Sequence, residues 1–283
     1  MPRNPSRHFR RARALVFVAL LAAAVLFLLQ LAPQRSSAVK GGTAAFPSSA
    51  PTSAPNSSSL DAAINGVLAD NSQYQVGVAL LDLNSGALKQ YGVEEPFEAA
   101  STAKVLTAVA YYMLVEAGDA SLDDPMGDYT AGFQLQEMVQ DSDNDSWALL
   151  SDAVGHARLR ADAAAMGVSY DPEENTLTTA GMARTLADLY GGKLLNQEHT
   201  EQLLSYMQDT NNEDLIPAVL PAGVSVFHKY GLLDDELHDA AILATATRSV
   251  VLVVYTKGTD LTDVPQRTAV IHRIAAAVAQ TLT

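Results

Sequence analysis

Apolar residues recur along the chain at spacings that change from helical to extended and back. Near position 60 they lie three or four residues apart, which predicts a short helix over 60–68. Residues 74–83 approach strict alternation, and after an Asn-Ser-Gly turn a second extended stretch covers 87–91. Two extended stretches joined by a glycine-containing turn predict a β-hairpin.

The chain beyond this hairpin divides into a helical part and a strand-rich part. A continuous apolar run over 105–115 predicts a buried central helix. Further helices are predicted at 144–154, 178–190 and 197–209, strands at 224–229, 240–245 and 249–255, and an amphipathic last helix from Pro265 onwards. This order predicts an α+β fold, in which a five-stranded antiparallel sheet carries helices on its faces.

The first 32 residues differ from everything that follows them. Arginines gather before position 14, and residues 14–32 are apolar apart from Gln30, which is close to the length of a bilayer-spanning helix. A basic segment followed by an apolar one is typical of a signal anchor or signal peptide, and its basic side stays in the cytoplasm. We therefore expect the remainder to be extracytoplasmic, anchored by residues 14–32, or secreted if cleavage occurs near Ala38.

A composition change separates this segment from the rest of the chain. Residues 33–59 are rich in Ser, Pro, Ala and Thr and contain almost no large apolar side chain, which predicts a flexible linker. Residues 60–283 have the length and apolar content of one domain with its own core.

Charge and cysteine content narrow the possible partners. Seven of the 18 basic residues and none of the 32 acidic residues lie in the first 40 positions, so residues 41–283 carry a net charge near −21. Such a surface repels phosphate backbones, and we expect no nucleic-acid partner. The chain has no cysteine, which excludes disulfides, a thiol nucleophile and cysteine metal sites.

Two residues of complementary chemistry, Ser101 and Lys104, lie three positions apart. If a helix opens at Ser101, both side chains share one face of its first turn. A serine hydroxyl needs a neighbouring base to act as a nucleophile, and a partly desolvated lysine amine can be that base. The alternative is a helix-capping serine and a solvated lysine, but the apolar residues around Lys104 favour its burial.

A second polar motif, Ser-Asp-Asn, occupies positions 142–144. Three aspartates at alternate positions from Asp141 also match the opening of a calcium-binding loop. However, Ser146 stands where that loop needs glycine, and Asp152 stands where it needs glutamate. We therefore disfavour calcium and expect no metal site.

A third motif, Lys229-Tyr230-Gly231, closes the predicted strand at 224–229. In this order the three motifs resemble the S-x-x-K, S-D-N and K-T-G motifs of class A β-lactamases and penicillin-binding proteins. The departure is Tyr230, which stands where that superfamily has a small hydroxyl residue. The resemblance extends over 60–283 and implies the superfamily's fold, a sheet with an inserted all-helical subdomain, and no cofactor.

The resemblance implies a role for each residue of the first two motifs. Ser101 would be the acylated nucleophile and Lys104 its base or proton relay. Ser142 would pass a proton to the leaving nitrogen, and Asn144 would bind the substrate amide. Asp143 would be structural.

The resemblance also implies substrate contacts along the third motif. Lys229 would supply a positive field for a substrate carboxylate, Gly231 would allow close approach, and the Leu232 N–H would be the second oxyanion donor. A phenol at Tyr230 places its oxygen further out than a threonine does, so carboxylate recognition is expected to differ. His238 aligns with a carboxylate-binding arginine of many class A enzymes, and it either contributes when protonated or is an edge-strand surface residue, which we favour.

The expected deacylation base is less well matched than the nucleophile. Residues 171–175 read Asp-Pro-Glu-Glu-Asn, which is similar to the Glu-Pro-Glu-Leu-Asn loop of class A enzymes, with Asp171 in the place of the base. Glu173 is a second candidate, and a solvated acidic turn is the alternative. The next predicted helix follows at once, so most of the loop's second half is missing, and we expect inefficient deacylation.

The sequence thus favours an exported serine hydrolase that is acylated at Ser101 by β-lactams or related amides. Two alternatives stay open: a penicillin-binding protein similar to D-Ala-D-Ala peptidases, and a noncatalytic cell-wall binding or sensor module on the same fold. The expected partners are a small-molecule β-lactam or a peptidoglycan stem peptide, and the membrane through the N-terminal segment.

Overall fold

The computed structural model of the protein describes residues 57–282. The predicted anchor at 1–32 and most of the predicted linker at 33–59 lie outside these residues. The last three linker positions are already helical, because the first described helix begins at Ser57. Within 57–282, no helix is both long enough and apolar enough to cross a bilayer.

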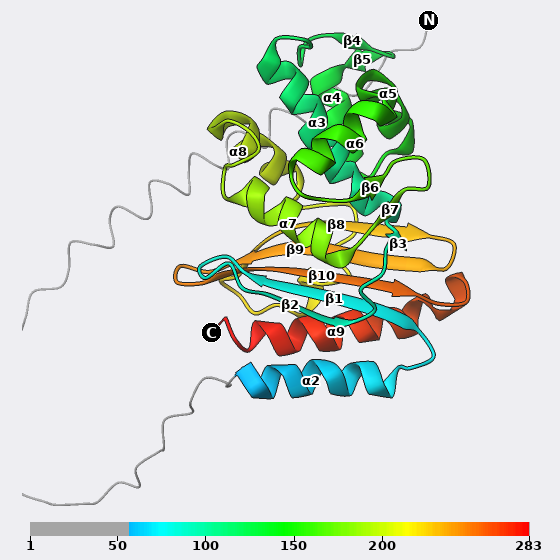
Figure 1. Ribbon diagram of the computed structural model, residues 1–283, viewed down its shortest axis with the longest axis vertical. Coiled ribbons are helices and arrows are strands. Elements are labelled where there is room, and N and C mark those ends of the chain that lie inside the picture. The colour runs from blue at the N-terminus through cyan, green and yellow to red at the C-terminus, as the bar shows by residue number, and fades with distance from the viewer. Residues whose placement is uncertain (1–56, 283) are drawn as a thin grey trace, which may run out of the picture. The chain divides into compact units, whose positions relative to one another are not determined.

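A five-stranded antiparallel sheet forms the centre of the described domain, in the order β2-β1-β10-β9-β8 (Figure 1). The predicted α+β fold is confirmed. The strands are β1 (Gln75–Asp82), β2 (Leu88–Gly92), β8 (Ser225–Leu233), β9 (Glu236–Ala244) and β10 (Ser249–Lys257). Strand β8 forms an edge and continues four residues beyond its predicted end, so the Lys229 motif lies within the strand instead of closing it.

The two faces of the sheet carry different helices (Figure 1). Helices α2 (Ser57–Asp70) and α9 (Val264–Ala279) pack on one face, where Leu252 and Val254 of β10 join their core. The alternate residues Val251 and Val253 belong to the core on the other face, under the helical part of the chain. Because β10 is buried on both faces, its sequence is continuously apolar instead of alternating.

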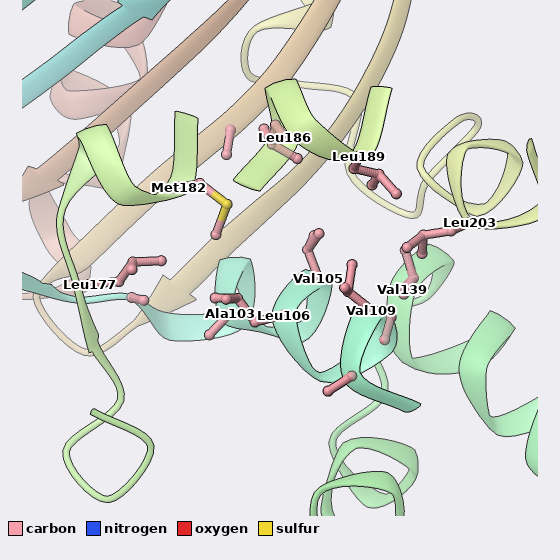
Figure 2. Packing of buried hydrophobic residues seen from close by; sticks show 14 of the residues in the cluster. Ala103, Val105, Leu106, Val109, Val139, Leu177, Met182, Leu186, Leu189 and Leu203 are labelled. Carbon is pink, nitrogen blue, oxygen red and sulfur yellow. The ribbon is translucent and has the colours of Figure 1, made fainter. Parts of the chain in front are cut away.

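The helical part between β2 and β8 is built around one buried helix. It comprises α3 (Lys104–Ala117), α4 (Ala131–Gln140), α5 (Asn144–Val154), α6 (His156–Ala165), α7 (Thr179–Tyr190) and α8 (Gln197–Tyr206). Every residue of α3 from Lys104 to Tyr112 is buried, which confirms the predicted central helix. Figure 2 shows Val105 and Val109 of α3 in a core that includes Leu189 of α7.

Two of these helices, α4 and α6, were not predicted from the sequence. Helix α6 buries only Leu159 and Ala163, so its apolar positions are too sparse to give a helical pattern. Helix α4 buries Leu135 and Met138 but also Gln134, whose amide donates to the Met126 carbonyl (2.8 Å). A hydrogen-bonded glutamine at a core position interrupts the apolar pattern, so the pattern did not predict this helix.

Short strands pair on the helical side and bring distant segments together. In one ladder β3 (Phe97–Glu98) pairs with β7 (Thr176–Leu177), which also pairs with β6 (Tyr170–Asp171). A second pair consists of β4 (Pro125–Met126) and β5 (Tyr129–Thr130). The first ladder places residues 175–177 against the segment that immediately precedes Ser101.

Candidate active site

Ser101 lies in a short 3-10 helix, Ala100–Ala103, that leads directly into α3. Neither helix start has a side-chain cap, so the alternative of a capping serine is wrong. The Ser101 hydroxyl makes no hydrogen bond to any residue within 57–282, and the residue is half-buried. Ala100 adopts the left-handed conformation (φ 47°), which is uncommon for a residue with a side chain and turns the chain sharply just before Ser101.

Gly231 of β8 lies against this turn. A Cβ atom on Gly231 would lie 3.0 Å from the Ala100 Cβ and 3.1 Å from the Ser101 backbone nitrogen. Contacts that close would force one of the two backbones to move. The sequence predicted that this glycine admits a substrate backbone, and the structure shows that it also admits the protein's own Ser101 segment.

The Leu232 N–H points away from the sheet. Strand β8 pairs with β9 without interruption from Ser225 to Leu233, and the His228 N–H donates to the Met207 carbonyl (2.8 Å) on the outer side. Hydrogen-bonding groups alternate between the two sides of a strand. The Leu232 N–H, four residues after that of His228, therefore points to the same open edge.

Lys104 is fully buried, as its apolar neighbours predicted. Its amine donates to the Ser142 carbonyl (2.6 Å) and the Asn144 Oδ1 (2.7 Å), and lies 3.3 Å from the Ser142 hydroxyl. It also lies 5.1 Å from the centroid of the Trp147 ring. Burial lowers the pKa of Lys104 to about 8, against the opposing charge of Asp143. The amine therefore loses its proton far more easily than an exposed lysine.

The loop that meets Lys104 is held by backbone strain and a helix cap. Ser142 has a φ of 57°, a conformation that non-glycine residues keep only when the surroundings enforce it. Asp143 caps α5, because its carboxylate accepts from the Ser146 N–H (2.7 Å). That hydrogen bond lowers the pKa of Asp143. The structural role expected for Asp143 is thus confirmed. A separate finding is that no group of acidic or histidine side chains within 57–282 could hold a metal ion.

Lys229 is also fully buried, and Tyr230 covers its amine. The Lys229 amine donates to the Tyr230 carbonyl (3.2 Å) and lies 4.2 Å from the centroid of the Tyr230 ring. Burial, together with the nearby charge of Lys104, lowers the pKa of Lys229 to about 7. Two desolvated amines thus lie close together, and the charge of Lys104 makes it harder for Lys229 to carry a proton.

His238 is not the surface residue that the sequence predicted. It is fully buried, and it stacks on Tyr255 with 4.1 Å between ring centroids. Its Nε2–H donates to the Glu98 carbonyl (2.9 Å), and its Nδ1 accepts from the Thr256 N–H (3.1 Å). Burial lowers the pKa of His238 to about 4. A neutral ring with both nitrogens occupied has no proton to offer a substrate carboxylate.

The predicted deacylation segment forms a tight turn between β6 and β7. The Asp171 carboxylate accepts from the Glu173 N–H (3.0 Å) and lies 3.7 Å from Arg160, and Glu173 pairs with the same arginine. Asn175 reaches the Ser101 segment, because its side-chain amide donates to the Ala100 carbonyl (3.1 Å). Asp171 as the base stays a prediction, and its carboxylate is already engaged by the turn and by helix α6.

Sequence inspection missed a buried charged cluster one residue before Lys229. The His228 ring contacts the Asp239 carboxylate through Nδ1 (2.9 Å), and the Glu213 carboxylate (3.2 Å) and Thr210 hydroxyl (3.0 Å) through Nε2. Burial alone would lower the pKa of His228, but the two carboxylates raise it to about 9. The pairing of a strand histidine with residues 11 and 15 positions away left no local signal in the sequence.

The sheet with its inserted helical half and buried Lys104–Ser142 contact defines a protein of the class A β-lactamase fold. The sequence profile of the Beta-lactamase enzyme family matches residues 59–282, and the chain belongs to this family. No curated protein sequence matches the chain.

Solved structures of this fold match most of the chain. The acyl-enzyme complex of a PBP-A mutant with penicillin G is 23% identical, with a TM-score of 0.72, and the match covers 79% of this chain and 96% of that one. A β-lactamase from Xanthomonas campestris pv. campestris is 24% identical (TM-score 0.73; 79% and 97% covered). A mutant of the reconstructed class A β-lactamase of the last common ancestor of Gram-negative bacteria is 27% identical (TM-score 0.72; 78% and 97% covered).

Proposed function

We propose that the protein is a serine hydrolase that is acylated at Ser101 by β-lactams or related amides. The observation that carries this proposal is the burial of Lys104, with its lowered pKa and its contacts to Ser142 and Asn144. Its buried amine, with a pKa of about 8, contacts Ser142 and Asn144 one helical turn after a serine whose hydroxyl has no partner within 57–282. Such an amine can accept a proton near neutral pH, which a serine nucleophile requires.

The proposed acylation step requires only the side chains of Ser101, Lys104 and Ser142. The Ser101 oxygen bonds to the carbonyl carbon of the amide, and the carbon–nitrogen bond breaks. The hydroxyl proton passes to neutral Lys104, and the Ser142 hydroxyl, 3.3 Å from that amine, relays a proton to the leaving nitrogen. Asn144, whose carbonyl oxygen accepts from Lys104, would present its side-chain NH₂ to the substrate.

Two backbone N–H groups would stabilise the oxyanion of this step. The Ser101 nitrogen lies beside Gly231, and the N–H of Leu232 points to the open edge of the sheet next to it. Paired N–H donors aimed at a developing negative charge contribute strongly to acyl transfer. Substitution of Gly231 would disturb both donors at once.

We propose that hydrolysis of the acyl-enzyme is slow. The two candidate deacylation bases from the sequence, Asp171 and Glu173, are both paired with Arg160. A mutant of PBP-A, a structural relative, was solved as an acyl-enzyme complex with penicillin G. These observations favour a penicillin-binding enzyme over a fast β-lactamase, with a peptidoglycan stem peptide as a second candidate substrate. The basic and apolar sequence of residues 1–32 supports export with the domain outside the membrane.

Intact mass spectrometry of the full-length protein with benzylpenicillin, beside Ser101→Ala, tests the proposal. We expect a long-lived adduct in the wild type and none in Ser101→Ala. A short-lived adduct with accumulating product would establish a β-lactamase and overturn slow deacylation. Absence of any adduct would overturn lactam acylation and leave either another acyl substrate or the noncatalytic binding or sensor module.

A further inference from the structure

We propose that the Ser101 site selects amides and esters without a free carboxylate beside the scissile bond, and that Tyr230 sets this preference. The inference rests on the proposed function, because it concerns substrates that acylate Ser101. It assigns a substrate class: neutral or amine-bearing peptides, amides and esters, including amidated or internal peptide bonds in preference to free C-termini.

The Lys229 amine on edge strand β8 is already engaged by Tyr230. Lys229 is fully buried, and its amine already has an acceptor in the Tyr230 carbonyl and an aromatic face at 4.2 Å. A ring at this distance takes the place of an anion beside the ammonium group. A substrate carboxylate would have to displace the Tyr230 ring before it could pair with Lys229.

No other cationic side chain within 57–282 can replace Lys229 as the partner of a substrate carboxylate. Apart from Lys104, Lys229 and Arg184, every lysine and arginine within 57–282 has a carboxylate at ion-pair distance. Lys104 is occupied by Ser142 and Asn144. His238 is neutral and bonded through both ring nitrogens.

Arg184 lies too far away to take part. It lines a pocket of about 460 Å³ together with Ser249, at the first residue of β10. The Ser101 segment instead contacts the other end of that strand, where the Thr102 and Tyr255 hydroxyls are 2.6 Å apart. Six residues of a strand span about 20 Å, so Arg184 cannot bind a group attached to the reacting amide.

The loop that contacts Lys104 through Ser142 is rich in acidic residues. Asp141 and Asp145 flank the Ser142 loop, and Asp143 lies within it. Burial and the charges of Asp141 and Asp143 raise the pKa of Glu137, a sign that these carboxylates repel one another. A carboxylate that entered beside Ser142 would meet the same repulsion. An uncharged group avoids it, and an ammonium group would be attracted.

The test compares benzylpenicillin with its methyl ester, two lactams that differ in the carboxylate alone. The rate constant of adduct formation with the full-length protein is measured for each, and divided by the compound's own rate of alkaline hydrolysis. We expect the ester to react at least as fast as the acid in the wild type. In Tyr230→Thr, which uncovers Lys229, the acid-to-ester ratio should rise about tenfold, the usual worth of a hydrogen bond to a charged group.

Two further variants serve as controls. One separates the Tyr230 ring from its hydroxyl, and the other tests whether a tyrosine-to-threonine change elsewhere has the same effect. Tyr230→Phe keeps the ring over Lys229, so the wild-type ratio should persist. Tyr129→Thr makes the same change at an exposed tyrosine of β5 and should leave the ratio unchanged.

Each outcome of the comparison is decisive. A wild-type preference for the acid of about tenfold or more, the worth of a bonded charge, would overturn the inference while leaving acylation at Ser101 intact. A ratio in Tyr230→Thr equal to that of the wild type would overturn the role of Tyr230. Reaction with neither compound would overturn the proposed function and this inference with it.

Discussion

Two segments that meet at Ser101 differ in where their polar side chains are bonded. On one side, Lys104 is buried and bonded to both Ser142 and Asn144, so three groups of the proposed acylation step are held by one another. On the other side, the turn at 171–175 directs its carboxylates to Arg160, and only Asn175 reaches the Ser101 segment. The difference teaches that one fold can hold the side chains of the proposed acylation step firmly while it bonds the proposed deacylation carboxylates elsewhere.

Removal of the Lys104 amine should have the largest effect. Lys104→Ala should slow adduct formation by about a thousandfold, the usual contribution of a general base, and intact mass against time measures it. Lys193→Ala removes a lysine that pairs with Asp188 on the surface, and it should react like the wild type. Equal rates in the two variants would mean that Lys104 is not the base.

The pH dependence of acylation sharpens the same side of the comparison. Only neutral Lys104 accepts a proton, and the pKa of Lys104 is about 8. The rate should therefore rise about tenfold per pH unit from pH 6 to 7 and level off above about 8. With benzylpenicillin, a fall in rate above pH 7 would show instead that charged Lys229, whose pKa is about 7, binds the carboxylate.

The smallest effect is expected from a change in the turn at 171–175. Asp171→Ala should change the lifetime of the adduct by less than about threefold, since the carboxylate is already held by the turn and by Arg160. Decay of the purified adduct measures this lifetime. A lifetime longer by about a hundredfold or more, the scale of a general base, would restore Asp171 as the base, and Glu173→Ala provides the matched comparison.

Much of the fold could be predicted because it depends on local pattern. The hairpin at 74–91, the central helix after Lys104 and the last three strands all follow from apolar spacing that a single element imposes on its own residues. Helix α6 could not be predicted, because it buries few apolar side chains. The length of β8 was also missed, since pairing with β9 extends it past Gly231, a residue type that is depleted in strands.

The candidate site divides in the same way. Sequence by itself determined the spacing of Ser101 and Lys104, the Ser-Asp-Asn loop and the unusual Tyr230, because a motif is a property of neighbouring residues. Only the tertiary structure decided that His238 is neutral and buried and that His228 is charged between two carboxylates. Two histidines on adjacent strands look alike in a sequence, and their protonation depends on which distant groups the fold places beside each ring.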